Sequence, residues 1–483
     1  MRLRILIIFE YFFKLFSMKF PIHLNIFIFC CLFLSTPLSG QSTKAAETDA
    51  FFVRKIYDEA LTNGQAYQWL TYLTTKIGGR LAGTPASLAA VEYGRQMLDT
   101  LQMDSVWLQP CMVPHWHRGD IETVRVTHSA LGSMELKATT LGNSIGTKKG
   151  IHAEVVEVKS LDEVEKLGAS IQGKIVFYNR AMDPRQLRTF NAYGGAVDQR
   201  VFGASKAAKF GALGTIVRSM GIRLDDFPHT GTLVYEEGVR QIPSMAISTN
   251  DAEQLSDLLT LGKVELYMHT NCQTLSDKKS YNVIGEIKGS THPDEIILVG
   301  GHLDSWDIGD GAHDDGAGCV HAMDVIHTLR RLNYTPKRTI RCVLFMNEEN
   351  GQAGAIEYME QSNKNGEFHI AAIESDAGGF TPRGFTCDAT EAVFNEKFKP
   401  LYDRFIPLLE PYGLYLQKGG SGADISRLKS QNGLLFGFRP DSQRYFDYHH
   451  TATDKIEAVN ERELELGAAA MTSLVYLLDK YGI

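Results

Sequence analysis

The sequence predicts an α/β protein in which a mostly parallel β-sheet is flanked by helices and interrupted by an inserted β-rich domain. From Tyr281 onward, continuous apolar runs alternate with segments whose apolar residues recur every three or four positions. This alternation is typical of a parallel sheet with helices on its faces. Across residues 118–275, by contrast, short β-rich runs are separated by turn residues. The change of character indicates a second domain.

The N-terminal segment differs from the rest of the chain. Residues 26–34 form an uninterrupted apolar run that follows Lys19, and small residues precede Gln41. This pattern predicts a signal peptide over residues 1–40, which starts at the first residue or at Met18. An uncleaved membrane anchor is the alternative, but the run is too short to span a bilayer alone. We therefore expect an exported protein, periplasmic or extracellular, without a stable membrane span after cleavage.

Residues 41–117 are predicted to start the main domain, which residues 276–483 complete. The segments 66–77 and 87–101 have the apolar spacing of helices, and residues 105–114 have the pattern of a strand. The β-rich domain would then be inserted between two parts of one sheet domain.

Side chains that bind metals follow the predicted strands. His302 and Asp304 come after one apolar run, Glu348 and Glu349 after the next, and Asp376 after a third. In open α/β sheets, ligands bind at the carboxyl ends of the strands. These side chains are therefore expected at one edge of the sheet.

The stretch from residue 300 to residue 318 is too acidic to be core packing. Imidazole together with carboxylate suits zinc better than calcium, which favours oxygen ligands. Two zinc ions at short separation need a carboxylate that bridges them. Asp314 is in position to bridge, and the remaining ligands divide into two pairs, which are His302 with Asp376 and Glu349 with His450.

Glu348 is next to a predicted ligand but is not needed as one. A carboxylate beside an activated water can take its proton as a general base and later pass it to the leaving amine. Asp304, two residues after His302, can hold that imidazole in one tautomer. The sequence therefore predicts metal-assisted amide hydrolysis.

Several neighbours leave the assignment open. His313 and His449 are adjacent to the chosen ligands and could replace them, whereas Asp315 could simply cap the helix that follows. His321 and His327 lie within a helical pattern, where a structural role is the simpler interpretation.

Composition excludes some functions. The formal net charge is −8 and no basic stripe is present, so no nucleic-acid partner is expected. The cysteines after the leader are odd in number and irregularly spaced, which does not indicate a disulfide framework, although one bridge is possible. Cys319 and Cys342 fit buried thiols.

These residues resemble a known family. In order and spacing, the chain is similar to the di-zinc aminopeptidase-like exopeptidases, and within them to the plasma glutamate carboxypeptidase (carboxypeptidase Q) group. The wide family is marked by the zinc motifs, and the narrower group by stretches in the N-terminal and middle regions. The zinc motifs are "GHLDSWD", "DDGAG", "EENG", "ESDAGG" and "HHTATD", and the other stretches are "GGRLAGTP", "PHWHRGD", "LGNSIGT", "GKIVFYN", "PHTG" and "IPSMAIS".

The resemblance implies two zinc ions per chain, although another divalent metal is an alternative. It also implies Glu348 as the catalytic base, Asp304 as the residue that orients His302, and a cis peptide bond after Asp314. Asp424, in "GGSGADIS", would lie near the substrate. The implied zinc ligands are His302, Asp314, Glu349, Asp376 and His450.

The middle region would be a protease-associated domain that covers the site. Relatives of this group are homodimers that cleave dipeptides and release free amino acids. The sequence departs from the family at His313, Asn347 and Lys455, none of which removes a ligand. These departures put the substrate preference in doubt.

The expected function is that of an exported di-zinc dipeptidase or aminopeptidase that acts on small peptides. One alternative is an aminopeptidase or carboxypeptidase acting on longer peptides. The other is a non-catalytic receptor or binding domain on the same fold.

Overall fold

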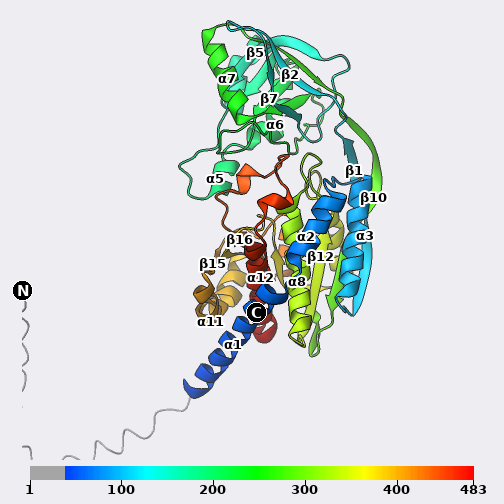
Figure 1. Cartoon of the computed structure of the whole chain (residues 1–483), viewed down its shortest axis with the longest axis vertical. Coiled ribbons are helices and arrows are strands. Elements are labelled where there is room, and N and C mark those ends of the chain that lie inside the picture. The colour runs from blue at the N-terminus through cyan, green and yellow to red at the C-terminus, as the bar shows by residue number, and fades with distance from the viewer. Residues whose placement is uncertain (1–38) are drawn as a thin grey trace, which may run out of the picture. The chain divides into compact units, whose positions relative to one another are not determined.

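The structure, a computed structural model, describes residues 39–483 (Figure 1). The predicted signal peptide therefore lies almost entirely outside the described residues. The chain divides into two units, Met1–Phe51 and Phe52–Ile483, and helix α1 (Ser39–Asn63) contains the boundary between them. In the part of the chain that the structure describes, no helix combines the length and the apolar character needed to cross a membrane.

The first sheet has eight strands and is mixed. Its four central strands, β12, β11, β13 and β16, are parallel, and the strands on either side of them run antiparallel to them, β10 to β12 and β14 to β16. The α/β prediction is confirmed, and the parallel pairing is concentrated at the centre of the sheet. In spatial order the strands are β1 (Ser105–His117), β10 (Gln273–Ile287), β12 (Arg338–Phe345), β11 (His292–His302), β13 (Phe368–Glu374), β16 (Leu434–Pro440), β14 (Pro382–Asp388) and β15 (Tyr415–Lys418).

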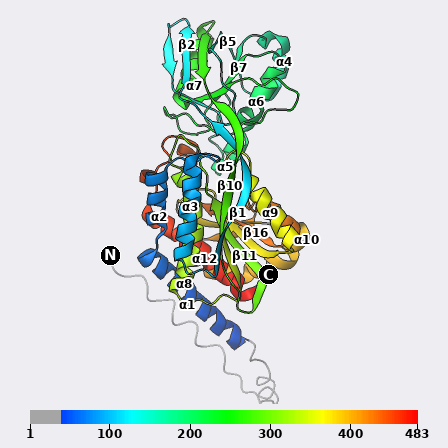
Figure 2. The same cartoon turned by 90° about the vertical axis from the view of Figure 1, so that its right-hand side faces the viewer.

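Helices cover both faces of this sheet (Figures 1 and 2). Successive strand residues point to opposite faces, so Ile297 and Val299 of β11 join the core formed with α3, α8 and α12. Leu298, between them, joins the core formed with α9. The helices that accompany the sheet are α2 (Ala66–Tyr72), α3 (Pro85–Thr100), α8 (Ala317–Arg331), α9 (Ala353–Asn365), α10 (Glu391–Val393), α11 (Lys399–Leu409) and α12 (Glu461–Tyr481).

A second sheet of eight strands is formed between residues 122 and 270. One of its hydrophobic cores lies wholly within this region, and the other also includes Phe380, Tyr445 and Phe446. Its strands, in spatial order, are β3 (Met134–Leu136), β2 (Glu122–His128), β9 (Glu265–Thr270), β5 (Ile151–Val158), β6 (Ile175–Tyr178), β7 (Gly214–Arg218), β8 (Ser244–Ile247) and β4 (Ala138–Thr140). The accompanying helices are α4 (Leu161–Leu167), α5 (Thr189–Gly194), α6 (Asp198–Ala208) and α7 (Thr249–Leu261).

One long ladder joins the two sheets. Strands β1 and β10 pair antiparallel from Ser105 opposite Glu286 to His117 opposite Gln273. The chain therefore leaves the first sheet along β1 and returns beside the same strand along β10 (Figure 2). The segment between these strands, which includes the whole second sheet, is called the insert below.

All five cysteines of the described chain are buried and unbridged. For Cys319 and Cys342 this confirms the prediction of buried thiols.

A buried pair of carboxyl groups holds the start of α2. Asp324 on α8 accepts the Gln65 N–H at 3.2 Å, and Glu465 on α12 accepts the Tyr67 N–H at 3.2 Å. The other oxygen of each group, Asp324 Oδ2 and Glu465 Oε2, has no hydrogen-bond partner among the described residues, and the two groups act on each other electrostatically. Burial raises the pKa of Glu465 to about 7, and burial together with Glu465 raises the pKa of Asp324 well above its ordinary value.

This pair predicts a pH-dependent stability. The pKa of Glu465 is about 7 in the folded chain, above its ordinary value of 4.5. The protonated carboxyl group therefore stabilises the fold fully below pH 4.5, and this stabilisation is lost as the pH rises through about 7. Glu465→Gln stays neutral at every pH. The free energy of unfolding of this variant minus that of the unaltered protein should therefore be larger at pH 8 than at pH 4.5, by about 1–3 kcal/mol.

Urea unfolding at both pH values measures this change. Glu360→Gln is the control, because Glu360 is exposed on α9. An equal difference at the two pH values would contradict the expected titration of Glu465.

Candidate metal centre

The central parallel strands bring polar side chains to one edge of the sheet. His302 is the last residue of β11, Glu349 follows β12, and Asp376 follows β13. Because these three strands are adjacent and parallel, their carboxyl ends lie together. The segments that follow the strands therefore meet, although up to 74 residues of chain separate them.

A short irregular turn, Ala312–Gly316, carries Asp314 to the same edge. The peptide bond between Asp314 and Asp315 is cis, as the resemblance implied. The Asp454 carboxylate accepts the Asp314 N–H at 3.1 Å and the N–H of the preceding residue at 2.7 Å. Asp454 thus holds the backbone on which the Asp314 side chain depends.

Asp315 has a structural role on the other side of the turn. Its carboxylate accepts the backbone N–H of His302 at 3.0 Å and that of Gly318 at 2.9 Å. A Cβ on Gly318 would lie 1.9 Å from the Ser375 carbonyl oxygen, so only glycine allows the first turn of α8 to approach β13 this closely. The capping interpretation of Asp315 agrees with these contacts.

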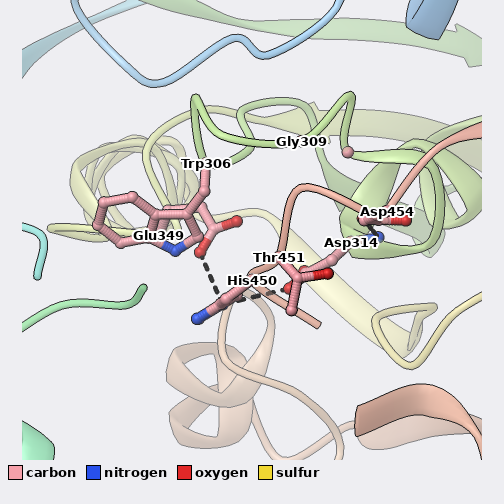
Figure 3. A pocket seen from close by; sticks show the side chains of 8 residues that line it. Trp306, Gly309, Asp314, Glu349, His450, Thr451 and Asp454 are labelled. Carbon is pink, nitrogen blue, oxygen red and sulfur yellow. Dashed lines mark hydrogen bonds and ion pairs between the residues drawn. The ribbon is translucent and has the colours of Figure 1, made fainter. Parts of the chain in front are cut away.

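The five predicted ligands form one continuous set of contacts with Asp314 at its centre. Asp314 Oδ1 lies 3.2 Å from His302 Nε2, and Asp314 Oδ2 lies 3.2 Å from His450 Nε2. His302 Nε2 is also 3.7 Å from Asp376 Oδ1, and His450 Nε2 is 3.2 Å from Glu349 Oε2. Figure 3 shows His450 between Asp314 and Glu349. Each oxygen of Asp314 therefore faces a different histidine.

Three groups of side chains in the described chain have ligand atoms within 4.8 Å of one another. Each group contains Asp314 or His302, and together the groups include all five predicted ligands. The groups are Asp314, His449 and His450; His302, Asp314 and Glu349; and His302, Asp315 and Asp376.

The electrostatics of the set favour a bound cation. Burial lowers the pKa of His302, but Asp314 and Asp376 outweigh burial and raise this pKa well above its ordinary value. For His450, burial is likewise outweighed by Glu349 and Asp314, which raise the pKa to about 10. Burial and Asp314 raise the pKa of Glu349 to about 7. The clustered carboxylates thus attract positive charge, which a metal ion would supply.

Two buried oxygens point to the same conclusion. Glu349 Oε1 has no hydrogen-bond partner among the described residues, and Asp314 Oδ2 is paired only with histidine nitrogens, of which His450 Nε2 is 3.2 Å away. Buried carboxylate oxygens are normally paired or bound to a metal. Both residues line a small pocket (Figure 3) whose other lining residues are Trp306, Gly309, Gly311, His450, Thr451 and Asp454.

Asp304 organises the segment that contains Glu348. Its Oδ1 accepts the N–H groups of Asn347 at 2.7 Å and Glu348 at 3.0 Å. The His302 Nδ1 atom lies 3.0 Å from the Asp304 backbone carbonyl oxygen and 3.8 Å from its carboxylate. The backbone of Asp304 is therefore closer to the imidazole than its side chain is. The carboxylate mainly positions the loop of the predicted base.

Glu348 and Asp424 belong to a group of buried acids beside the predicted ligands. Burial, followed by Asp376 and Glu349, raises the pKa of Glu348 well above its ordinary value. Asp424 is 2% exposed, and neither of its carboxylate oxygens has a hydrogen-bond partner. Burial and the charge of Glu348 raise the pKa of Asp424 as well. The structure thus brings the predicted base and the predicted substrate residue into one acidic region.

The structure distinguishes the two neighbouring histidines. His313 Nδ1 accepts the Gly379 N–H at 3.1 Å, its Nε2 lies 3.2 Å from the Ala458 carbonyl oxygen, and its ring stacks on Phe380. Burial lowers the pKa of His313 to about 4, so its ring is neutral at pH 7. Both ring nitrogens are already occupied by these backbone contacts. His449, in contrast, remains near the centre, with Nε2 3.7 Å from Asp314 Oδ2.

Sequence reasoning missed two arginines that hold the loop between His302 and Asp314. Arg80, completely buried, donates to the carbonyl oxygens of Leu303, Asp310 and Gly311 at 2.5–3.0 Å. Arg118, at the start of the insert, binds both carboxylate oxygens of Asp307. The motifs "GGRLAGTP" and "PHWHRGD" contain these arginines, but their partners are backbone atoms and a loop aspartate that no local pattern identifies.

Comparisons with known proteins agree with this geometry. The model of peptidase family M28 matches residues 282–475. Carboxypeptidase Q of Bos taurus is 32% identical over 426 residues, which cover 88% of this chain and 86% of the relative. Carboxypeptidase Q of Xenopus laevis is 33% identical over 417 residues, which cover 86% of each chain.

Solved structures share the fold. A peptidase M28 precursor from Shewanella amazonensis SB2B superimposes with a TM-score of 0.85 at 32% identity, and the match covers 91% of this chain and 98% of that chain. A zinc aminopeptidase from Bacillus subtilis has a TM-score of 0.61 at 20% identity, and the match covers 85% of this chain and 94% of that one. The second likeness concerns the fold alone.

Proposed function

The chain belongs to peptidase family M28 and is a metallo-exopeptidase related to carboxypeptidase Q, and from this premise we propose that it hydrolyses dipeptides and other small peptides to free amino acids. The observation that carries the proposal is the set of contacts centred on Asp314, in which each carboxylate oxygen faces one histidine. This arrangement suits a carboxylate that bridges two cations.

Two ions, zinc or another divalent metal, would share Asp314. His302 and Asp376 would complete one site, and Glu349 and His450 the other. The unpartnered buried oxygen of Glu349 and the pairing of each Asp314 oxygen with a histidine support this assignment. When bound, the ions would polarise the scissile carbonyl and lower the pKa of the attacking water.

Glu348 would move the proton. Its carboxylate would accept a proton from the attacking water and then donate it to the nitrogen of the leaving amine as the C–N bond breaks. Burial, first of all, raises the pKa of Glu348 above its ordinary value, and a raised pKa suits a carboxyl group that must hold a proton before it passes it on. Asp304 would act as a positioning residue, because it holds the backbone N–H of Glu348.

The insert would act as a protease-associated domain over the site, with domain limits near residues 118 and 275. The ladder of β1 with β10 supports the idea of an insertion, since the chain returns beside the strand along which it left. Asp424 would contribute to the substrate site from the main domain. Export and a homodimer are part of the proposal, and they rest on the sequence pattern and on the resemblance, respectively.

Metal removal tests the proposed function. Zinc-loaded protein is expected to cleave dipeptides faster than tetrapeptides, and removal of the metal by a chelator should abolish both activities. It should also lower the melting temperature, since metal binding to the folded chain stabilises it. Activity assays with zinc analysis and thermal unfolding, before and after zinc is restored, measure these effects.

The outcomes separate the alternatives. Faster cleavage of tetrapeptides would indicate an exopeptidase that acts on longer chains. Zinc-loaded protein without any peptidase activity would support the non-catalytic receptor, whereas full activity in metal-free protein would contradict the metallopeptidase mechanism.

A further inference from the structure

The insert holds a buried guanidinium group that has no anionic partner. Arg200, on α6, is only 4% exposed. Its Nη2 donates to the Tyr193 hydroxyl at 2.8 Å, but Nε and Nη1 have no hydrogen-bond partner among the described residues. Burial of a charged group without a partner is costly. An anion that reaches either of these nitrogens would therefore bind favourably.

Two buried imidazoles add to this group. His229 is 2% exposed and His449 is 7% exposed, and the Nδ1 atom of each has no hydrogen-bond partner. Tyr193 connects Arg200 to His449, because its hydroxyl accepts from Arg200 Nη2 at 2.8 Å and its ring centroid lies 5.3 Å from that of His449. His229 is two residues before Gly231, which lies against Arg200. Three neighbouring buried side chains thus have unpartnered nitrogen atoms, which is the chemistry of an anion site.

This nitrogen cluster, formed by Arg200, His229 and His449, borders the metal centre. A Cβ on Gly231 would lie 2.5 Å from Arg200 Cζ and 2.8 Å from His450 Nδ1, so the guanidinium and the predicted ligand approach the same glycine. His449 also reaches toward the centre, because its Nε2 is 3.7 Å from Asp314 Oδ2. Because Gly231 has no side chain, nothing at this position separates Arg200 from the predicted ligand His450.

The closeness of Arg200 to the predicted ligand His450 indicates which anion the nitrogen cluster binds. Consecutive α-carbons of a peptide are about 3.8 Å apart. A substrate group that reaches the nitrogen cluster while the scissile bond is at the metal centre therefore belongs to the residue that follows this bond. In a dipeptide, the anionic group of that residue is its terminal carboxylate. Arg200 Nη1, which lies against Gly231, can donate a charge-assisted hydrogen bond to that carboxylate.

We infer that Arg200, assisted by His449 and His229, binds the α-carboxylate of the substrate residue that follows the scissile bond. This inference rests on the proposed function and deepens it. The preferred substrates are then peptides whose scissile bond precedes the last residue, above all dipeptides. A C-terminal amide has the same shape but no charge, and it should bind poorly.

Three substrates test the inference on the unaltered zinc-loaded protein. These are leucyl-leucine, leucyl-leucine amide and leucyl-glutamate amide, which carries its only carboxylate on the side chain. The kcat/KM of leucyl-leucine is expected to exceed that of either amide by about 30-fold or more, mostly through KM. Equal cleavage of leucyl-leucine and its amide would overturn the carboxylate site, and rapid cleavage of leucyl-glutamate amide would overturn the choice of the α-carboxylate.

Variants connect the effect to Arg200. Arg200→Gln should lower kcat/KM for leucyl-leucine by about 30-fold or more, and should change that for leucyl-leucine amide by less than about 3-fold. Arg200→Lys should restore part of the loss, because it restores the charge. Arg185→Gln is the control, since the Arg185 side chain is 88% exposed and pairs with Asp183.

The readouts separate the inference from the proposed function. Equal losses for the acid and the amide in Arg200→Gln would overturn the inference and leave the peptidase function intact. No cleavage of any of the three substrates by the zinc-loaded protein would overturn both. Thermal unfolding of each variant establishes that it is folded, and the comparison of acid with amide on the unaltered protein needs no variant.

Discussion

Glu348→Gln is expected to lower kcat for a dipeptide by about 10²–10⁴-fold while the metal content of the protein stays unchanged. Glutamine keeps the size of the side chain, but its amide cannot accept the proton of the attacking water. The contact of Asp304 with this loop uses the backbone N–H of Glu348, so the substitution leaves that contact in place. Steady-state kinetics and zinc analysis of the purified variant measure the two quantities.

Glu360→Gln is the matched control, because Glu360 is exposed on the helix that follows the same loop, and its activity should not change. Retained activity in Glu348→Gln would contradict the role of general base. Loss of metal from that variant would instead make Glu348 a ligand and would require the pair Glu348 and Glu349 to be reassigned.

Asp314→Ala is expected to release bound metal and to lower kcat/KM by about 10³-fold or more. A metal ion supplies several kcal/mol of transition-state stabilisation, and each 1.36 kcal/mol corresponds to about a tenfold change in rate. Asp314 lies 3.2 Å from both His302 Nε2 and His450 Nε2, so its loss should affect both sites. Zinc analysis and a chelator competition measure the metal affinity, and peptide kinetics measure the rate.

Asp314→Asn separates charge from shape, because it keeps one carbonyl oxygen and should retain more metal than the alanine variant. Asp403→Asn, at an exposed position on α11, is the control for loss of a carboxylate and should retain its metal. Unchanged zinc in Asp314→Ala would contradict the bridge and would point to Asp315 or His449, which belong to the other candidate groups.

Much of the site could be predicted because its residues follow local patterns. A buried parallel strand is a continuous apolar run, and a polar residue at its carboxyl end faces the edge of the sheet. His302, Glu349 and Asp376 follow such runs, and the structure brings them together. Asp314 and His450 do not follow this rule directly. They were identified by residue type and by their place in the chain.

The choice between adjacent residues required the structure. His313 and Asp314 have neighbouring positions in one acidic loop, yet both ring nitrogens of His313 are occupied by the backbone at Gly379 and Ala458. Those partners are more than 60 residues away in the sequence, so no local pattern could identify them. The same holds for Asp454, whose carboxylate holds the turn that presents Asp314.

The sequence by itself determined the α/β class and the side chains suited to bind metal, because apolar periodicity and residue chemistry are local properties of a chain. The tertiary structure alone decided the antiparallel strands beside the parallel centre, the roles of Arg80 and Arg118, and the approach of Arg200 to His450. These features depend on which distant segments pack together. That packing follows from the burial of both faces of the sheet and from the pairing of buried polar groups. Both depend on residues far apart in the chain, so no short stretch of sequence reveals them.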